Sequence, residues 1–336
     1  MVALPANRRI LLVRRPVGIP QSGDFAIDEA AQEPIRDGQF RIRNLYLSVD
    51  PAQRGWVNEG TNYAPAVPLG SVMRALAVGL VIESRHADIP IGSHVYGWLG
   101  WQHYAVATPA DILSHFAEPA APLSCYGGIL GINGLTAHLA LNRIGRPCRG
   151  ETVLVSTAAG AVGSVVGQLA QAMGCEVAGL TGDDDKVRLC QTRFGYHRAA
   201  NYKTATIDTV LDAVVPDGVD VFFDSVGGEI LDAVLRRMRT GGRIVQCGTA
   251  SIATWSPDPV GLRNEREVLT RRLNWGGFVI FDHVAHFPGA IAELATAVRS
   301  GALTYEEDIR AGLEQAPDAL ADLYAGRNSG KVLISL

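Results

Sequence analysis

A glycine-bearing segment in the middle of the chain has the spacing of a dinucleotide-binding turn. The apolar run at 153–155 predicts a strand buried on both faces. Ala158-Ala159-Gly160-Ala161-Val162-Gly163 then turns the chain, and small and apolar residues at helical spacing over 164–173 predict a helix that Gly174 ends. Glycines let backbone N–H groups approach a pyrophosphate, and a helix N-terminus attracts its charge. The pattern therefore predicts a nucleotide site. A plain packing turn is the alternative, since Ala158 occupies the first glycine position.

The residues after the next strand indicate which nucleotide is bound. An NAD-binding chain usually carries Asp or Glu about 20 residues after the first glycine, to hold the ribose 2′-hydroxyl. Here that position falls on the neutral Leu180-Thr181-Gly182, where nothing repels a 2′-phosphate. Three acids follow at 183–185 and are well placed to cap the next helix. Lys186 could reach a phosphate, with Arg188 as a second candidate, and Tyr202 and Lys203 could flank it. We therefore expect NADPH.

Alternating strands and helices must position these residues. The pattern after Gly174 predicts strands at 175–180, 198–201, 219–223 and 243–247, and helices at 183–194, 208–215 and 229–238. Such alternation is typical of an α/β fold with a doubly wound parallel sheet. Ligands of these sheets bind at the carboxyl ends of the strands.

Residues 1 to about 125 predict a compact β-barrel-like domain. Short apolar runs are separated by Gly, Pro and Asp turn signals, and no long amphipathic helix interrupts them. Asp50 and Arg54 follow a predicted strand at 45–49 and could form a turn cap and an ion pair. A helix from about Ala290 and a final strand at 331–335 complete the chain.

Composition limits the class of protein. The chain has 336 residues, enough for about two domains, and a net charge of −4 that gives no general reason to bind nucleic acid or a membrane surface. We expect neither partner, and no run has the length of a signal-peptide core or membrane span. The five cysteines are scattered and suit reduced thiols in the cytoplasm. The histidines lie too far from Cys or Glu for a metal set, so we predict no metal.

With these residues assembled, the chain resembles the zinc-free medium-chain dehydrogenases/reductases. It is most similar to the branch of leukotriene B4 12-hydroxydehydrogenase/prostaglandin reductases, alkenal double-bond reductases and curcumin reductases. The segments that carry the resemblance span almost the whole chain: Leu45 to Pro51 with Arg54, Gly100-Trp101-Gln102 with Tyr104, Gly134 to Ala137, Ala158 to Gln168, Asn201-Tyr202-Lys203, Phe223 to Gly228, Cys247-Gly248, Gly277-Phe278 with Phe281, and Gly330-Lys331.

The resemblance implies a GroES-like barrel domain at 1–125, completed by 297–336, and a Rossmann NADP-binding domain at 126–296, usually in a homodimer. It implies that residues 160–163 hold the pyrophosphate and that Lys186 and Tyr202 lie at the 2′-phosphate. Cys247 and Phe278 would line the nicotinamide half. The other cofactor-binding residues that it implies are Thr136, Ser225, Gly248, Val279 and Asn328.

The chain departs from the family pattern at three places. Ser225 replaces an asparagine that touches the cofactor, and a hydroxyl cannot make both amide hydrogen bonds. Ala52 stands where relatives often have tyrosine after Asp-Pro. Another family tyrosine falls in register with Ala253. The usual proton donor is therefore unassigned, and Tyr46 and Tyr63 are the candidate catalytic hydroxyls, with simple packing roles as the alternative.

The expected function is NADPH-dependent reduction of the carbon–carbon double bond of α,β-unsaturated aldehydes and ketones, with hydride transfer to the β-carbon. Hydrogen bonds would stabilise the enolate oxygen that develops. Two alternatives stay open. One is NADPH-dependent quinone reduction by the same fold, and the other is a non-enzymatic NADPH-binding protein.

Overall fold

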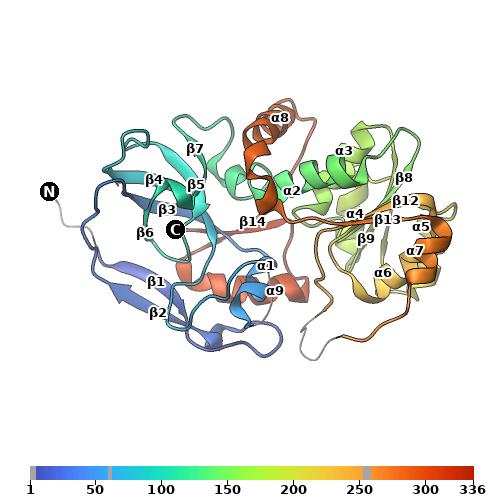
Figure 1. Ribbon diagram of the computed structural model, residues 1–336, viewed down its shortest axis with the longest axis horizontal. Helices are drawn as coiled ribbons and strands as arrows, with labels where there is room; N and C mark the ends of the chain where they lie inside the picture. Colours follow the sequence, from blue (N-terminus) through green and yellow to red (C-terminus); the bar gives the residue numbers. More distant parts are fainter. Residues whose placement is uncertain (1–4, 60–62, 253–258) are drawn as a thin grey trace. The chain divides into compact units, whose positions relative to one another are not determined.

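The chain divides into two compact units. Unit 1 combines Met1–Gly131 with Glu307–Leu336, and unit 2 is Ile132–Glu306. The computed structural model describes residues 5–59, 63–252 and 259–336 (Figure 1).

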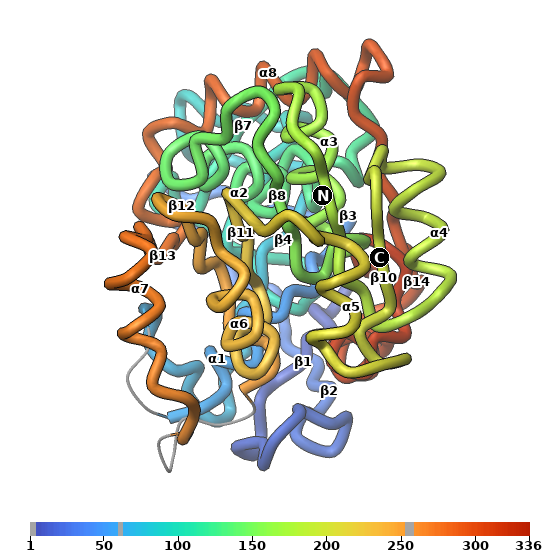
Figure 2. The backbone as a smooth tube through the Cα atoms, turned by 90° about the vertical axis from the view of Figure 1, so that its right-hand side faces the viewer, coloured from blue at the N-terminus to red at the C-terminus, as the bar shows by residue number. Residues whose placement is uncertain are grey.

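Unit 2 contains the predicted parallel sheet. Its strand order is β10 (Arg198–Asn201), β9 (Glu176–Thr181), β8 (Thr152–Ser156), β11 (Val219–Asp224), β12 (Met238–Gln246) and β13 (Asn274–Gly277). Every neighbouring pair is parallel, and Figure 2 shows β13, β12, β11, β8 and β10 following one another from left to right. The chain runs outward from β8 to β10 and then crosses back to β11. The strand order therefore reverses between β8 and β11, which is the switch point where such sheets bind ligands.

Helices cover both faces of this sheet because its strands are apolar on both faces (Figure 1). One buried cluster joins Leu154 of β8 and Phe222 of β11 to the apolar sides of α5 (Ile207–Val214) and α6 (Gly228–Leu235). Helix α3 (Gly163–Ala172) packs on β8 and β9 through the buried Val165 and Val166, as the sequence predicts.

The remaining helices of unit 2 are α2 (Ile132–Ala140), α4 (Asp184–Thr192), α7 (Glu265–Arg271) and α8 (Phe287–Arg299). Two predicted boundaries are wrong, and the sequence did not predict β13. The helix expected to reach Met238 ends at Leu235, and β12 begins at Met238 instead of residue 243. Met238 pairs with Val219 of β11, and a register shift follows that pair.

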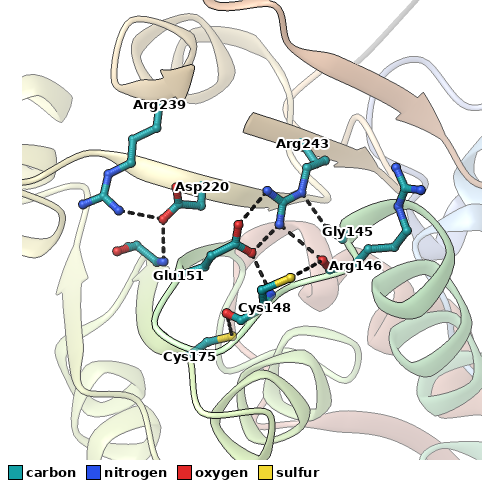
Figure 3. A network of polar contacts seen from close by, with 9 residues as sticks. Gly145, Arg146, Cys148, Glu151, Cys175, Asp220, Arg239 and Arg243 are labelled. Atoms are coloured by element: carbon teal, nitrogen blue, oxygen red, sulfur yellow. Dashed lines mark hydrogen bonds and ion pairs between the residues drawn. The ribbon is translucent and has the colours of Figure 1, made fainter. Parts of the chain in front are cut away.

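An ion-pair network closes the amino ends of the central strands (Figure 3). Arg243 of β12 pairs with Glu151, just before β8, with 2.9 Å between Nη1 and Oε1. Asp220 of β11 accepts a hydrogen bond from the Thr152 N–H at 2.8 Å and one from Arg239 at 2.8 Å. These contacts fix β8, β11 and β12 at the edge opposite to their carboxyl ends.

Unit 1 is built on a mostly antiparallel sheet. Its order is β14 (Glu307–Ala311), β15 (Lys331–Ser335), β3 (Phe40–Ser48), β4 (Leu76–Ser84), β5 (His94–Trp98) and β7 (Ile112–Phe116), and β6 (Tyr104–Ala107) also pairs with β3. Strands β1 (Asn7–Leu12) and β2 (Phe25–Ala30) form a separate hairpin. The fully buried Trp101 contacts Phe25, so this aromatic residue belongs to the core.

Two short helices of unit 1, α1 (Ala52–Val57) and α9 (Ala316–Ala325), lie beside the junction of β3 and β15. Lys331 of β15 is buried, and its Nζ lies 2.8 Å from Asp50 Oδ1 and 2.8 Å from the Val49 carbonyl oxygen. Ser48 also donates to the Asp50 carboxylate. Asp50 thus forms a buried ion pair, and its partner is Lys331. Among the helices of the described residues, none combines the length and the apolar character of a membrane span.

Candidate functional site

The turn after β8 is closed so tightly that it requires glycine. Thr157 adopts a left-handed conformation, with φ of +50°, and its carbonyl oxygen accepts a hydrogen bond from Gly160 N–H at 2.8 Å. A Cβ on Gly163 would lie 2.3 Å from that same oxygen, and one on Gly160 would lie 3.1 Å from it. A side chain at Gly163 would therefore displace the backbone.

The start of α3 presents unused donors at this turn. Val162 is the N-cap, and it makes no side-chain cap. Among the hydrogen bonds to described residues, none comes from the N–H groups of Ala161 or Val162. Unpaired N–H groups at a helix start attract an anion. The predicted pyrophosphate residues, 160–163, thus fit a diphosphate.

Tyr196 stabilises this turn through a hydrogen bond to its backbone. Its hydroxyl donates to the Gly163 carbonyl oxygen at 2.7 Å, and burial raises its pKa well above the ordinary value, so it stays a donor. Its ring lies where a Cβ on Gly167 would come within 2.3 Å, which explains the extra glycine one helical turn later. The sequence analysis missed Tyr196, because nothing in the local pattern links it to a turn 33 residues earlier.

Cationic and hydroxyl groups gather at the carboxyl end of β9. The Lys203 Nζ and the Tyr202 hydroxyl would each lie 3.2 Å from a Cβ placed on Gly182. Lys186 is in the first turn of α4. Burial lowers its pKa, the charge of Asp183 opposes this shift, and the charge of the nearby Lys203 adds to it. A lysine and a phenol that face one glycine, with Lys186 close to Lys203, suit a phosphate monoester.

The three acids after Gly182 are engaged elsewhere. Asp183 caps α4, accepting hydrogen bonds from the N–H groups of Asp185 and Lys186. Asp184 accepts one from the Asn201 amide at 2.9 Å, and Asp185 pairs with Arg188. The predicted cap is confirmed. Because Arg188 is paired with Asp185, Lys186 is the better placed of the two candidate cations.

The loops after β11 and β12 meet at the switch point. The buried Asp224 carboxylate accepts hydrogen bonds from the Ser156 hydroxyl and the Val226 N–H, each at 2.9 Å, and so shapes the turn around Ser225. The Ser225 N–H donates to the Ser156 hydroxyl at 2.8 Å. A Cβ on Gly248 would lie 2.8 Å from the Ser225 carbonyl oxygen, so these two predicted residues are adjacent.

Cys247 and Phe278 begin the segments that follow β12 and β13. The Cys247 N–H donates to the Asp224 carbonyl oxygen at 2.8 Å, and burial raises the pKa of its thiol, so it is not a thiolate nucleophile. The Phe278 N–H donates to the Gln246 carbonyl oxygen, and its ring stacks on His283 with 4.6 Å between ring centres. Val279 follows Phe278 as the N-cap of the next turn. Thr136 is half-buried on α2, and no hydrogen bond among the described residues ties it to these segments.

The other predicted site residues belong to unit 1. Tyr46 is half-buried on β3, in register with Val78 of β4. Tyr63 lies in the loop after α1. The residue is 53% exposed, and partial desolvation raises its pKa. The charge of Asp50 adds to this rise, whereas Trp56 and Arg74 oppose it. The Asn328 amide donates to the Gly330 carbonyl oxygen at 2.8 Å. Ala253 lies outside the described residues.

No group of three or more His, Cys, Asp or Glu side chains with the arrangement of a metal site occurs in the described ranges.

Comparisons with known proteins agree along the whole chain. Residues 8–114 match the family model described as the N-terminal domain of oxidoreductase, and residues 161–296 match the model described as zinc-binding dehydrogenase. A 2-alkenal reductase (NADP(+)-dependent) of Nicotiana tabacum is 36% identical, over 98% of this chain and 97% of the relative. The NADPH-dependent curcumin reductase of Escherichia coli (strain K12) is 34% identical, over 98% of this chain and 96% of the relative.

A solved structure, that of CurA from Vibrio vulnificus in complex with NADPH, is 34% identical to this chain. It covers 98% of each chain with a TM-score of 0.89. The predicted fold class, a GroES-like barrel domain with a doubly wound Rossmann domain, is confirmed.

Proposed function

This chain belongs to the medium-chain dehydrogenase/reductase family, in the branch of the alkenal, curcumin and prostaglandin reductases, and from that premise we propose that it reduces the carbon–carbon double bond of α,β-unsaturated aldehydes and ketones. It is an NADPH-dependent oxidoreductase. The main support for reduction of the double bond is the similarity, over 98% of the chain, to a protein named as a 2-alkenal reductase.

The residues of unit 2 suit NADPH. NADPH supplies, when bound, the hydride that the double bond accepts. The N-terminus of α3 with residues 160–163 would hold the pyrophosphate, and Lys186, Tyr202 and Lys203 would hold the 2′-phosphate. The loops around Ser225, Cys247 and Gly248, together with Thr136, Phe278 and Val279 of unit 2 and Asn328 of unit 1, are the further contacts that we propose.

The candidate hydroxyls would act on the substrate oxygen. Reduction at the β-carbon moves negative charge onto the carbonyl oxygen, and a neutral phenol can donate a hydrogen bond to it. A tyrosine phenol is protonated at neutral pH, and the pKa of Tyr63 is raised further. We propose Tyr63 and Tyr46 for this role, in an enzyme that needs no zinc and works as a cytoplasmic homodimer.

A substrate panel tests the proposal. NADPH oxidation would be followed with an enal, an enone, a quinone and a saturated aldehyde, each with and without a chelator. We expect turnover of the enal and enone, little with the saturated aldehyde, and no effect of the chelator. Turnover of the quinone alone would favour quinone reduction, and NADPH binding without any turnover would favour a binding protein.

A further inference from the structure

Arg54 on α1 is a buried cation without a carboxylate partner. Only 6% of the residue is exposed, and its Nη2 is enclosed with no hydrogen-bond partner in the described part of the chain. Other buried cations of unit 1 are paired. Arg41 lies 3.0 Å from Glu83, and Lys331 lies 2.8 Å from Asp50. Arg54 therefore lacks the kind of carboxylate partner that Arg41 and Lys331 have.

An aromatic ring supports the Arg54 guanidinium on one side. Its Cζ lies 4.7 Å from the centre of the Tyr324 ring, a cation–π distance. The Tyr324 hydroxyl donates to the Pro51 carbonyl oxygen at 2.6 Å, which joins α9 to the start of α1. This bond connects residues 273 positions apart, and it holds the ring against the guanidinium.

Among the residues that the structure describes, no acidic group near Arg54 neutralises it at physiological pH. Burial raises the pKa of Tyr324 to about 12, although Arg54 opposes the rise, so the phenol stays neutral. The pKa of Tyr63 is also raised by burial. Asp50 is bound to Lys331 and Ser48. Arg74, the other cation near Tyr63, donates to the Pro65 carbonyl oxygen at 2.6 Å and adds positive charge.

Burying a guanidinium without a counter-charge is unfavourable, and a cation–π contact recovers only part of the loss. An anion that arrives with a ligand would restore the balance. A carboxylate suits a guanidinium best, because its two oxygens match the planar array of N–H donors.

We propose that Arg54 binds a carboxylate carried by the substrate, away from the reacting double bond, so that acidic enones and enals are the preferred substrate class. Tyr324 is a positioning residue, because it acts through Arg54. This inference rests on the proposed function, since it names the substrates that the same reductase prefers.

The test compares an enone that ends in a carboxylate with the methyl ester of the same enone. For the wild-type protein, kcat/KM should be about 10- to 100-fold higher for the acid, the ratio expected for one charge-assisted pair. Arg54→Gln should raise the KM of the acid to that of the ester, with little change in kcat. Arg54→Lys should keep part of the preference.

Further variants separate position from charge. Tyr324→Leu removes the ring and should raise the KM of the acid while the KM of the ester stays unchanged. Tyr324→Phe keeps the ring and should retain most of the preference. Arg43→Gln, at an exposed position of β3, is the matched control and should behave as wild type. Thermal unfolding and NADPH affinity would be measured for every variant.

Three results would overturn the inference. Equal kcat/KM values for the acid and the ester in the wild-type protein would show that the protein does not recognise the carboxylate. This comparison needs no variant. Equal losses for both substrates in Arg54→Gln would assign Arg54 to packing. Weaker NADPH binding in that variant would mean that the anion is a phosphate of the cofactor. If no enone is reduced at all, the proposed function itself is wrong. That outcome differs from equal kcat/KM values for the acid and the ester, which would contradict only the inference about Arg54.

Discussion

Lys186 is the residue on which the choice of nucleotide depends most. It lies near Lys203, whose Nζ faces Gly182. Of the neighbouring acids, Asp183 caps the helix, and Asp184 and Asp185 accept from Asn201 and Arg188. Lys186→Ala should raise the Kd of NADPH about 10- to 100-fold, since one charge-assisted contact to the 2′-phosphate is lost. The Kd of NADH should change far less. Fluorescence titration with both nucleotides measures the two values.

Arg188→Ala is the matched control for Lys186, because it removes a cation from the same helix that is already paired with Asp185. It should leave both affinities near those of the wild type. Equal losses for NADPH and NADH in Lys186→Ala would show that this lysine does not contact the 2′-phosphate.

Ser225 offers a second prediction at this scale. Its backbone is fixed by Ser156 and by the close approach of Gly248, and the side chain is the part that differs from relatives. Ser225→Asn should lower the Kd of NADPH by about 2- to 10-fold, since an amide can both donate and accept a hydrogen bond. A clear rise in Kd would mean that this loop has been reshaped around serine. Ser225→Ala, with neither group, serves as the comparison.

Local patterns predicted the helix cap, the glycine turn and the neutral end of β9 because each depends on residues close together in the sequence. The support that Tyr196 gives to Gly163 and the contact of Tyr324 with Pro51 span 33 and 273 residues. No periodicity marks such pairs, so side-chain contacts of this kind became visible only in the folded chain. The same reason explains why the sequence allowed an ion pair at Asp50 but did not identify its partner Lys331, which lies 281 positions later.

At the scale of elements, apolar runs located β8, β9, β10 and β11 to within one or two residues, but they did not predict β13, whose sequence Asn-Trp-Gly-Gly contains no apolar run. The error at β12 has a physical cause. Helical spacing continues through residues 236–238, but Met238 finds a backbone partner in Val219, and the register shift that follows accommodates the glycines at 241 and 242. Pairing with β11 therefore sets the start of β12, and the local sequence pattern contains no signal for that pairing.

The network at the amino ends of β8, β11 and β12 makes a prediction about acid stability. Hydrogen bonding from Arg243 lowers the pKa of Glu151, against the effect of burial. A lowered carboxyl pKa stabilises the fold above the ordinary value of 4.5, and that contribution is lost as the pH falls through the folded-state value. Glu151→Gln should therefore cost about 1–3 kcal/mol of unfolding free energy at pH 7 and progressively less below pH 4.5.

Urea unfolding between pH 7 and pH 3.5 measures this difference. Glu29→Gln, which breaks the exposed pair with Arg8, is the control and should change stability by about 0.5 kcal/mol or less at any pH. A Glu151→Gln deficit that does not shrink on acidification would mean that the side chain stabilises the sheet by packing and not by charge.

At the scale of the whole molecule, the C-terminal residues complete the sheet of unit 1. Strand β15 pairs antiparallel with β3, and β14 pairs parallel with β15. The sequence pattern shows that a final strand exists, but a strand five residues long does not encode which partner it chooses. Such long-range pairing depends on the apolar surface that all strands of the unit bury together. The contact between Lys331 and Asp50 adds a specific interaction between β15 and the end of β3.

The central claim is that the carbon–carbon double bond receives the hydride. NADPH deuterated at the transferable position of C4 would be used with an α,β-unsaturated ketone, and the product would be examined by NMR and mass spectrometry. We predict deuterium on the β-carbon and a saturated ketone as the product, because charge then develops on an oxygen that hydrogen bonds can stabilise. Deuterium on the carbinol carbon of an allylic alcohol would contradict the account and would make this protein a carbonyl reductase.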